Sequence, residues 1–247
     1  MIIWIASYPK SGNTWLRSLL CSYFFSDDGT FNFNLLKNIN SFPSENNFKS
    51  YDDKFENPED TAKYWIREQE KINESKKVKF LKTHNAFCKI NNYTFTNSQN
   101  TLGAIYLIRD PVERLWSNIR MEKNLYSSIN KQMSDSDAVK FYFKQARWCF
   151  DSRYDPVIKR LRDSFPKENL YIGIYEEMFT EKKVKELSDF VGIDFNPSMI
   201  KKKVNSSEKV SELDDDVIKE VQTFYKHVYE YCNLNYPQTK ELWRKIF

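Results

Sequence analysis

A nine-residue run near the start of the chain, S-Y-P-K-S-G-N-T-W at Ser7 to Trp15, holds the residue types that bind anions. It follows the apolar stretch 2–6 and leads into 14–25, where apolar residues recur at helical spacing, so it predicts a buried strand that turns into a helix. The N-terminus of a helix leaves backbone N–H groups unpaired and carries partial positive charge. Gly12 would let the backbone close tightly, and Lys10 adds a full charge.

Small polar residues fill the rest of the turn and offer further donors: Ser11, Asn13 and Thr14. Together with the helix N-terminus, this composition indicates a site for a phosphorylated ligand.

A second anion-binding group follows another apolar run, T-L-G-A-I-Y-L-I at Thr101 to Ile108, which is typical of a strand buried on both faces. Arg109 comes directly after this run, and Pro111 suits the first residue of a helix. Ser117 lies eight residues after Arg109, about two turns along that helix. An arginine and a serine so placed could hold one phosphate from two sides.

A third group is K-F-L-K-T-H at Lys79 to His84, a short predicted strand that ends in Lys82 and His84. Ligands of open parallel sheets bind at the carboxyl ends of strands, so Lys10, Lys82 with His84, and Arg109 are expected along one edge. The chain has two histidines. His227 falls in an amphipathic helical segment, where a packed or surface role is expected, which leaves His84 as the candidate base.

Both residues of the second group also have a plain structural alternative. Arg109 could form an ion pair with Asp110 or Glu113 at the end of its strand, and Ser117 could be an ordinary helix serine.

Strands that alternate with helices predict an α/β fold, a three-layer sandwich with a mostly parallel central sheet and a P-loop-like strand–turn–helix. We interpret residues 1–247 as a single domain, since no linker or repeat interrupts them. Residues 27–56 have little periodicity, and residues 85–99 are turn-prone and aromatic. We call 27–75 and 85–99 the cover because we expect them to cover the acceptor side of the site.

Further helices are expected from apolar periodicity and from end signals. The expected segments are 58–75, 135–165 with a break or restart at Pro156, 181–191 ended by Gly192, and 213–231 as one long helix.

Composition narrows the class of protein. The net charge of +4 is small and spread along the chain, so it suits an anionic nucleotide and requires neither nucleic acid nor membrane. The four cysteines stand far apart without zinc spacing, so we expect thiols in a reducing compartment and no metal. The first strand begins at once, which leaves no room for a signal peptide, and the apolar runs are too short to span a membrane. A cytoplasmic location is therefore expected.

The order of residues in the first run is specific. A Walker loop reads G-x-x-x-x-G-K-[ST], whereas here Lys10 precedes Gly12. The run P-K-S-G-x-T-W resembles the 5′-phosphosulfate loop of the sulfotransferases that use 3′-phosphoadenosine 5′-phosphosulfate (PAPS). The K-T-H ending at His84, the spacing of Arg109 and Ser117, and Y-E-E-M from Tyr175 are similar to the same family, with K-T-H typical of its cytosolic members.

The resemblance implies a role for each matching residue. His84 would be the catalytic base, Lys10 would bond the bridging or leaving-group oxygen, and Lys82 would hold a sulfonate oxygen. The backbone of residues 12–14 would bind the 5′-phosphate, and Arg109 with Ser117 the 3′-phosphate.

The aromatic residues of these motifs are implied to border the adenine: Trp15 and Tyr175. For Tyr175, a role in the hydrophobic core is an equal alternative.

One family feature is missing. The R-K-G segment that closes the nucleotide site in animal cytosolic enzymes is absent, and Lys201 to Lys203 could replace it only by charge.

The sequence thus predicts transfer of a sulfuryl group from PAPS to a hydroxyl of a small molecule, glycan or lipid. Two alternatives stay open: a nucleotide-dependent kinase of small molecules, and a non-catalytic protein that binds phosphoadenosine nucleotides.

Overall fold

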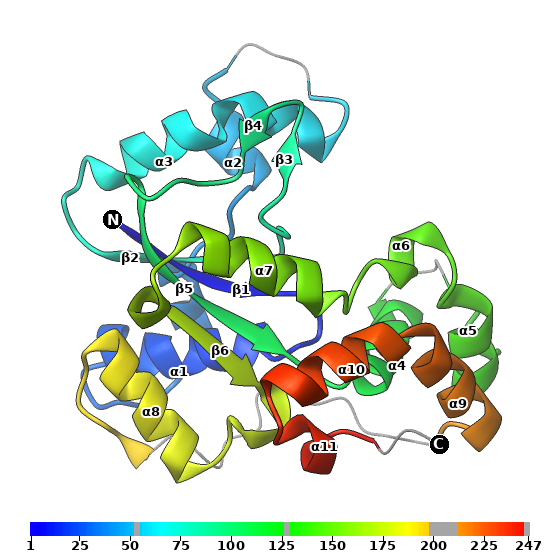
Figure 1. The fold of residues 1–247 in the computed structure, drawn as a ribbon. Coiled ribbons are helices and arrows are strands. Elements are labelled where there is room, and N and C mark those ends of the chain that lie inside the picture. The colour runs from blue at the N-terminus through cyan, green and yellow to red at the C-terminus, as the bar shows by residue number, and fades with distance from the viewer. Residues whose placement is uncertain (52–54, 126–128, 198–211, 245–247) are drawn as a thin grey trace.

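The computed structural model describes residues 1–51, 55–125, 129–197 and 212–244 (Figure 1). Within them, four parallel strands form the central sheet in the order β2-β1-β5-β6. The strands are β1 (Ile2–Ser7), β2 (Lys79–Thr83), β5 (Thr101–Ile108) and β6 (Leu170–Ile174), and a separate antiparallel hairpin joins β3 (Lys89–Ile90) to β4 (Tyr93–Thr94).

Helices lie on both faces of the sheet. The α-helices are α1 (Asn13–Phe25), α2 (Glu45–Phe48), α3 (Trp65–Asn73), α4 (Pro111–Leu125), α5 (Asp135–Tyr142), α6 (Ala146–Cys149), α7 (Tyr154–Ser164), α8 (Glu181–Val191), α9 (Asp215–Phe224), α10 (Lys226–Asn235) and α11 (Thr239–Leu242). The 3-10 helices are η1 (Phe33–Asn38), η2 (Pro58–Tyr64), η3 (Lys167–Asn169) and η4 (Tyr175–Glu177). The predicted three-layer α/β architecture is confirmed, with α1 and α8 on one face and α7 and α10 on the other (Figure 1).

The two central strands explain the layers. Every residue of β1 is buried, and alternate side chains point to opposite faces. Ile3 and Ile5 pack in the core beneath α1 and α8, whereas Trp4 and Ala6 pack in the core on the opposite face. A strand buried on both faces must be apolar throughout, which is why β1 and β5 are continuous apolar runs in the sequence.

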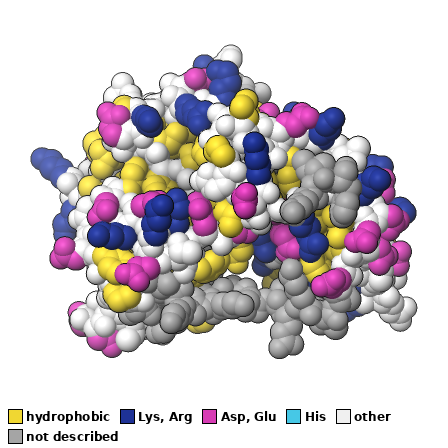
Figure 2. Space-filling model, turned by 60° about the horizontal axis from the view of Figure 1, so that its bottom comes forward, with side chains coloured by type: hydrophobic (Ala, Val, Ile, Leu, Met, Phe, Trp, Pro, Cys, Tyr) yellow, Lys and Arg dark blue, Asp and Glu magenta, His cyan; other side chains and the backbone are white. Residues whose placement is uncertain are grey.

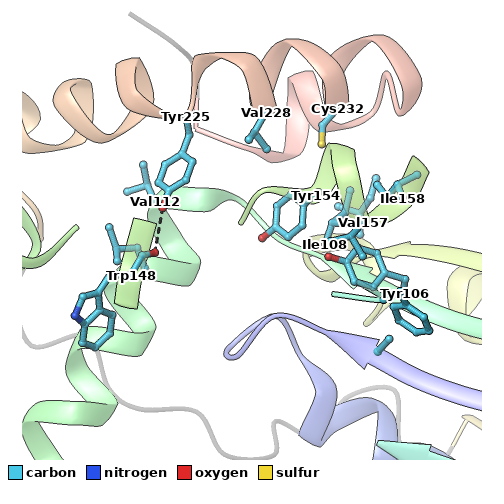
Figure 3. Close-up of a cluster of buried hydrophobic side chains, with 14 of the residues drawn as sticks. Tyr106, Ile108, Val112, Trp148, Tyr154, Val157, Ile158, Tyr225, Val228 and Cys232 are labelled. Carbon is cyan, nitrogen blue, oxygen red and sulfur yellow. Dashed lines mark hydrogen bonds between the residues drawn. The ribbon is translucent and has the colours of Figure 1, made fainter. Parts of the chain in front are cut away.

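The core on the α7 face is rich in aromatic residues (Figure 3). Tyr106 and Ile108 of β5 lie with Tyr154 and Val157 of α7, facing Val228 and Cys232 of α10. No disulfide joins the four cysteines of the chain.

The C-terminal helical segment differs from the single helix expected over 213–231. It is divided into α9 and α10 at Tyr225, whose backbone leaves the helical region with φ −94° and ψ 16°. The Tyr225 hydroxyl donates to the backbone oxygens of Trp148 and Cys149, both at 3.3 Å, and the first of these bonds is drawn in Figure 3. The break between α9 and α10 thus coincides with tertiary hydrogen bonds of Tyr225. The apolar periodicity of the sequence does not indicate this break.

Two other helical predictions are corrected in detail. The segment 135–165 contains three helices, and Pro156 lies in the first turn of α7, where a missing N–H costs no helical hydrogen bond. The segment 58–75 begins as the 3-10 helix η2 and becomes α-helical only at Trp65. The expected end of α8 is confirmed, since Gly192 caps it in the left-handed region at φ 74°.

The cover contains η1, α2, η2, α3 and the β3–β4 hairpin. In Figure 1, α2, α3 and the hairpin lie together above the sheet, whereas η1 packs against α1 on the opposite face. Aromatic rings join it to the sheet: Phe42 and Phe95 pack on Trp4, with ring centroids 5.7 and 4.9 Å away. Backbone pairing reinforces this contact, since Lys82 N donates to Asn40 O and Phe42 N to Lys82 O, each at 2.8 Å.

Candidate active site

The carboxyl edge of the sheet brings together the residues that the sequence singled out. Lys10, His84, Arg109 and Tyr175 each follow the end of a strand: β1, β2, β5 and β6 in turn. Because these strands are parallel, their carboxyl ends lie on the same edge. The chain places β2 on one side of β1 and β5 on the other, so the topological switch point, where ligands of such sheets bind, lies at β1.

The turn after β1 is tight and strained. Lys10 has a backbone φ of 69° although it is not a glycine, and Gly12 has a φ of 97°. A Cβ atom on Gly12 would lie 2.4 Å from Cδ2 of Tyr175, so glycine is required here both for conformation and for space. No side chain caps the start of α1. Its first backbone N–H groups are therefore available to an anion.

The polar side chains of this turn differ in exposure. Ser11 and Asn13 are buried, and Thr14 is partly exposed. The Asn13 side-chain amide donates to Ile5 O at 3.1 Å and to Ser7 Oγ at 3.3 Å. This amide braces the turn, so a contribution of Asn13 to ligand binding stays a prediction that rests on its backbone N–H.

Trp15 lies on the buried side of α1. It packs against Phe179 with a ring-centroid distance of 4.9 Å, and its indole N–H has no hydrogen-bond partner in residues 1–51, 55–125, 129–197 and 212–244. Contact between Trp15 and an adenine ring stays a prediction.

Arg109 connects the strand-end groups. Its Nη1 donates to the backbone oxygen of Lys10 at 2.7 Å, and its guanidinium lies 4.4 Å from the centroid of the Tyr175 ring. The alternative expected from the sequence, an ion pair with Glu113, also forms at 3.8 Å. The Nε of Arg109 is nevertheless buried, and the described part of the chain gives it no hydrogen-bond partner. Ser117 is buried on the adjoining helix α4.

His84 is held in one tautomer. Its Nδ1 lies 2.6 Å from the backbone oxygen of Ser7. A carbonyl oxygen can only accept, so Nδ1 carries the proton and Nε2 bears the lone pair of the neutral ring. Burial of the ring among protein atoms, followed by the charge of Lys82, lowers the pKa of His84 to about 4. The side chain keeps an exposed edge, and its low pKa leaves His84 neutral near pH 7. The other histidine, His227, is exposed on α10.

Two lysines carry charge that no acid offsets. Burial is the main cause that lowers the pKa of Lys10, with repulsion from Arg109 and Arg120 added. For Lys82, burial also acts first, followed by repulsion from Arg17. In the described part of the chain, no acidic side chain raises the pKa of either lysine, as an ion pair would.

Arg17 links the site to the cover. Its Nη2 donates to Leu36 O at 2.9 Å and to Ile39 O at 2.6 Å. The backbone of Lys82 pairs with the same part of the cover through residues 40–42. The cover is therefore fastened beside Lys82 and His84, and its place on the acceptor side stays a prediction.

Sequence reasoning missed several residues of the site. Tyr154 holds the backbone of Arg109, accepting from its N–H at 3.3 Å and donating to its oxygen at 2.8 Å. Arg120 lies one turn beyond Ser117, and it is 8% exposed. Neither Tyr154 nor Arg120 directly follows a predicted strand or belongs to one of the motifs. The sequence therefore predicts only that they lie on helices, from the apolar pattern around them.

A polar network behind Arg109 was also missed. Asp110 accepts from Tyr229 Oη at 2.9 Å and from Arg244 N at 2.7 Å. Glu176 accepts from Asp110 N at 3.1 Å and from Trp243 Nε1 at 2.9 Å, and burial is the main cause that raises its pKa to about 7. The network ties β5, β6 and the C-terminal segment together. Lys201 to Lys203, the expected substitute for R-K-G, lie outside the described residues.

The site fits a ligand with several negative charges. Lys10, Lys82, Arg109 and Arg120 bring four positive charges to one edge, and Arg109 and Arg120 retain buried nitrogen atoms without partners. Figure 2 shows Lys and Arg side chains mixed with Asp and Glu on the face it presents, without an extended basic track.

Two features are absent from the described residues. No group of three or more His, Cys, Asp or Glu is arranged to hold a metal ion. No helix there is long and apolar enough to cross a bilayer.

Comparisons with known proteins agree with this geometry. The sulfotransferase domain family matches residues 2–231. The structure is similar to mouse sulfotransferase SULT7A1 complexed with PAP, at 14% identity and a TM-score of 0.54, over 98% of this chain and 87% of that one. It is also similar to a sulfotransferase from Alicyclobacillus acidocaldarius, at 16% identity and a TM-score of 0.55, over 94% of each chain. These two likenesses show a shared fold. No curated protein matches in sequence.

Proposed function

The chain belongs to the sulfotransferase domain family, and we propose that it transfers a sulfuryl group from PAPS to an acceptor hydroxyl with His84 as the base. The observation that carries the proposal is the hydrogen bond from His84 Nδ1 to Ser7 O, which leaves Nε2 as a proton acceptor among the positive charges. A binding protein would need the charges but not an oriented base.

The donor nucleotide would be held at the centre of the carboxyl edge. We assign the 5′-phosphate to the backbone N–H groups of residues 12–14, where α1 has no side-chain cap. The 3′-phosphate is assigned to Arg109 and Ser117, supported by the unpartnered Nε of Arg109. Tyr175 stacks on Arg109 and contacts Gly12, so it would border the base of a nucleotide bound to both.

Sulfuryl transfer resembles phosphoryl transfer, in which catalysis is mainly positioning and stabilisation of charge. The acceptor oxygen would bond to sulfur while its proton passes to Nε2 of His84. The bond from sulfur to the bridging oxygen of the 5′-phosphate breaks, and 3′,5′-adenosine bisphosphate (PAP) leaves. Lys10 would stabilise the charge that develops on the leaving oxygen, and Lys82 would hold a sulfonate oxygen.

The low pKa of His84 fits this role. A base must be unprotonated before the reaction, and burial, followed by the positive charge of Lys82, keeps the imidazole neutral. The negative charges of bound PAPS would act in the opposite direction and raise the pKa of His84. Basicity would therefore increase when the donor is in place.

The acceptor would enter from the cover. A hydroxyl of a small molecule, glycan or lipid suits a histidine base. The cover lies over the β2 edge, which carries His84, and η2, β4 and the β3–β4 turn line a cavity of about 460 Å³. Its lining includes Phe55, Tyr93 and the carboxylates of Glu56, Glu59 and Asp60.

Calorimetric titration tests the proposal. We expect micromolar or tighter binding of PAP and much weaker binding of AMP, because AMP lacks the 3′-phosphate. Transfer of ³⁵S from labelled PAPS to a panel of alcohols would then identify the acceptor class.

The same titration separates the alternatives. Preference for ATP with Mg²⁺ would indicate a kinase and overturn the donor assignment. Tight binding of PAP without transfer or PAPS hydrolysis under any condition would favour a phosphoadenosine-binding protein.

A further inference from the structure

Arg120 is a buried cation near the proposed 3′-phosphate site, and binding of this phosphate by Arg109 and Ser117 alone gives it no role. It lies on α4 (Pro111–Leu125), three residues after Ser117, so the two side chains emerge on the same side of the helix. The side chain is 8% exposed, and its Nε and Nη1 atoms are buried without hydrogen-bond partners among the described residues. Leaving buried N–H groups of a cation unpaired is costly, so we expect them to bind a partner that this part of the chain does not supply.

Neighbouring groups position the guanidinium of Arg120 but do not accept hydrogen bonds from its Nε and Nη1 atoms. Its guanidinium lies 4.6 Å from the centroid of the Trp116 ring. The nearby carboxylates, Asp135 and Glu113, attract its charge yet bind other donors. Asp135 accepts from Trp116 Nε1 at 2.7 Å and from Lys123 Nζ at 2.9 Å.

Glu113 is occupied in a similar way. It accepts from Nη2 and Nε of Arg244 at 2.7 and 3.0 Å. Neither acid therefore supplies the unpartnered N–H groups of Arg120 with an acceptor.

The electrostatics place Arg120 next to the nucleotide site. Burial is the main cause that lowers the pKa of Lys10, and the charges of Arg109 and Arg120 lower it further. Burial is also the main cause that lowers the pKa of Arg120, and Arg109 adds to it. Three cations that repel one another at close range, with Glu113 as the acid between two of them, favour a dianion. A phosphate group supplies the required charge and accepts several hydrogen bonds at once.

We propose that Arg120 is a third ligand of the 3′-phosphate, which completes the grip of Arg109 and Ser117 where the chain has no R-K-G segment. This inference rests on the proposed function. Arg120 would donate from its unpartnered nitrogens while Trp116 holds the plane of the guanidinium. Its effect is specific to nucleotides that carry a 3′-phosphate.

The test compares PAP and AMP on purified full-length protein by calorimetry. We expect Arg120→Met to weaken binding of PAP by about 10- to 100-fold, because hydrogen bonds to charged groups are lost, and to leave AMP affinity unchanged. Lys123→Met is the matched control, since it removes a charge from the same helix that is already bound to Asp135. It should leave the ratio of PAP to AMP affinity unchanged.

Thermal unfolding separates a ligand role from a structural one. If Arg120 serves to bind a ligand, Arg120→Met should not lower the unfolding midpoint of the protein without nucleotide. PAP should raise the midpoint more in the wild type than in the variant. A lower midpoint for the variant, with the affinities for PAP and AMP reduced equally or not at all, would show a structural arginine and overturn the proposal.

The outcomes also separate the two levels of inference. A wild-type protein that does not prefer PAP over AMP refutes the proposed function and the role of Arg120 with it. A wild-type protein that prefers PAP, with the same preference in Arg120→Met, refutes only the role of Arg120. If Arg120→Met does not fold, Arg120→Lys decides in its place. It keeps the charge but loses the planar fork, and we expect it to weaken PAP by about 3- to 10-fold.

Discussion

The carboxyl edge of the sheet and the cover meet at Lys82, and they are built in different ways. At the edge, bonds join residues far apart in the chain: Arg109 Nη1 to Lys10 O spans 99 residues, and His84 Nδ1 to Ser7 O spans 77. In the cover, the polar bonds are mostly local, such as those of the capping boxes that begin α2 and η2. Aromatic rings also pack against one another in the cover, as in the stacked pair of Tyr51 and Tyr64, whose ring centroids lie 3.9 Å apart.

This difference suits the two tasks that we propose for the two regions. A site for a fixed, highly charged donor benefits from rigid strand ends and interlocked bonds, because catalysis depends on positioning. An acceptor site can be assembled from short helices and aromatic rings that change without disturbing the sheet. Changes at the edge should therefore affect donor binding or chemistry, and changes in the cover should affect acceptor choice.

The largest effect is expected for His84→Ala. Loss of the base should reduce turnover by about 10²- to 10⁴-fold, while PAP affinity stays nearly unchanged. Labelled PAPS with the best acceptor gives the rate, and calorimetry gives the affinity. His227→Ala, which removes the exposed histidine of α10, is the control and should retain full activity. Substantial activity in His84→Ala would remove His84 from the mechanism.

Substitution of two glycines tests whether the turn after β1 holds the nucleotide. Gly12 and Gly192 both have left-handed backbones, with φ of 97° and 74°, but only at Gly12 does a Cβ atom meet other atoms, Tyr175 among them. Gly192→Ala should lower the free energy of unfolding by about 1 kcal/mol, and Gly12→Ala by about 2 to 4 kcal/mol.

Only Gly12→Ala should also weaken PAP, by about 10-fold or more, because Tyr175 must move away from the turn. Urea unfolding and calorimetry at low temperature provide the two readouts. Equal PAP affinity in both variants would mean that the turn after β1 does not hold the nucleotide.

The acid–base state of the edge can be measured directly, because the chain has two histidines. NMR titration of the imidazoles, assigned with His227→Gln, should give His84 a midpoint near 4, below the ordinary value of 6.5. Lys82→Met should raise this midpoint, since a positive charge is removed.

The same shift has a consequence for stability. The folded state binds fewer protons than the unfolded state between pH 4 and 6.5, so His84 contributes stability that is lost as the pH falls through this range. A His84 midpoint at or above 6.5 without ligand would contradict the environment described for the ring.

The smallest effect on donor binding is expected in the cover. Tyr93 is 47% exposed on β4 and lines the cavity, so Tyr93→Ala should leave PAP affinity within about twofold and stability nearly unchanged. The order of acceptors in the PAPS screen should change. An unchanged order of acceptors would mean that the acceptor does not bind in this cavity. Weaker PAP binding would mean that the cover also contributes to donor binding.

Much of the fold and part of the site follow from the sequence alone, because they depend on local patterns. The apolar runs of β1 and β5 predict buried parallel strands, and the turn from Lys10 to Gly12 predicts an anion site at a helix start. Strand-end spacing likewise predicts that Arg109 and His84 share an edge.

Only the tertiary structure decided the rest, because the physical cause lies in residues distant along the chain. Helices α9 and α10 separate at Tyr225, which bonds to a segment 76 to 77 residues earlier. The buried, unpartnered guanidinium of Arg120 is visible only once its neighbours are in place. The hydrogen bond from His84 to Ser7, which selects the tautomer, joins two adjacent strands that the chain separates by 77 residues. Spacing determines which residues reach an edge, and packing determines which of their atoms remain available for a ligand.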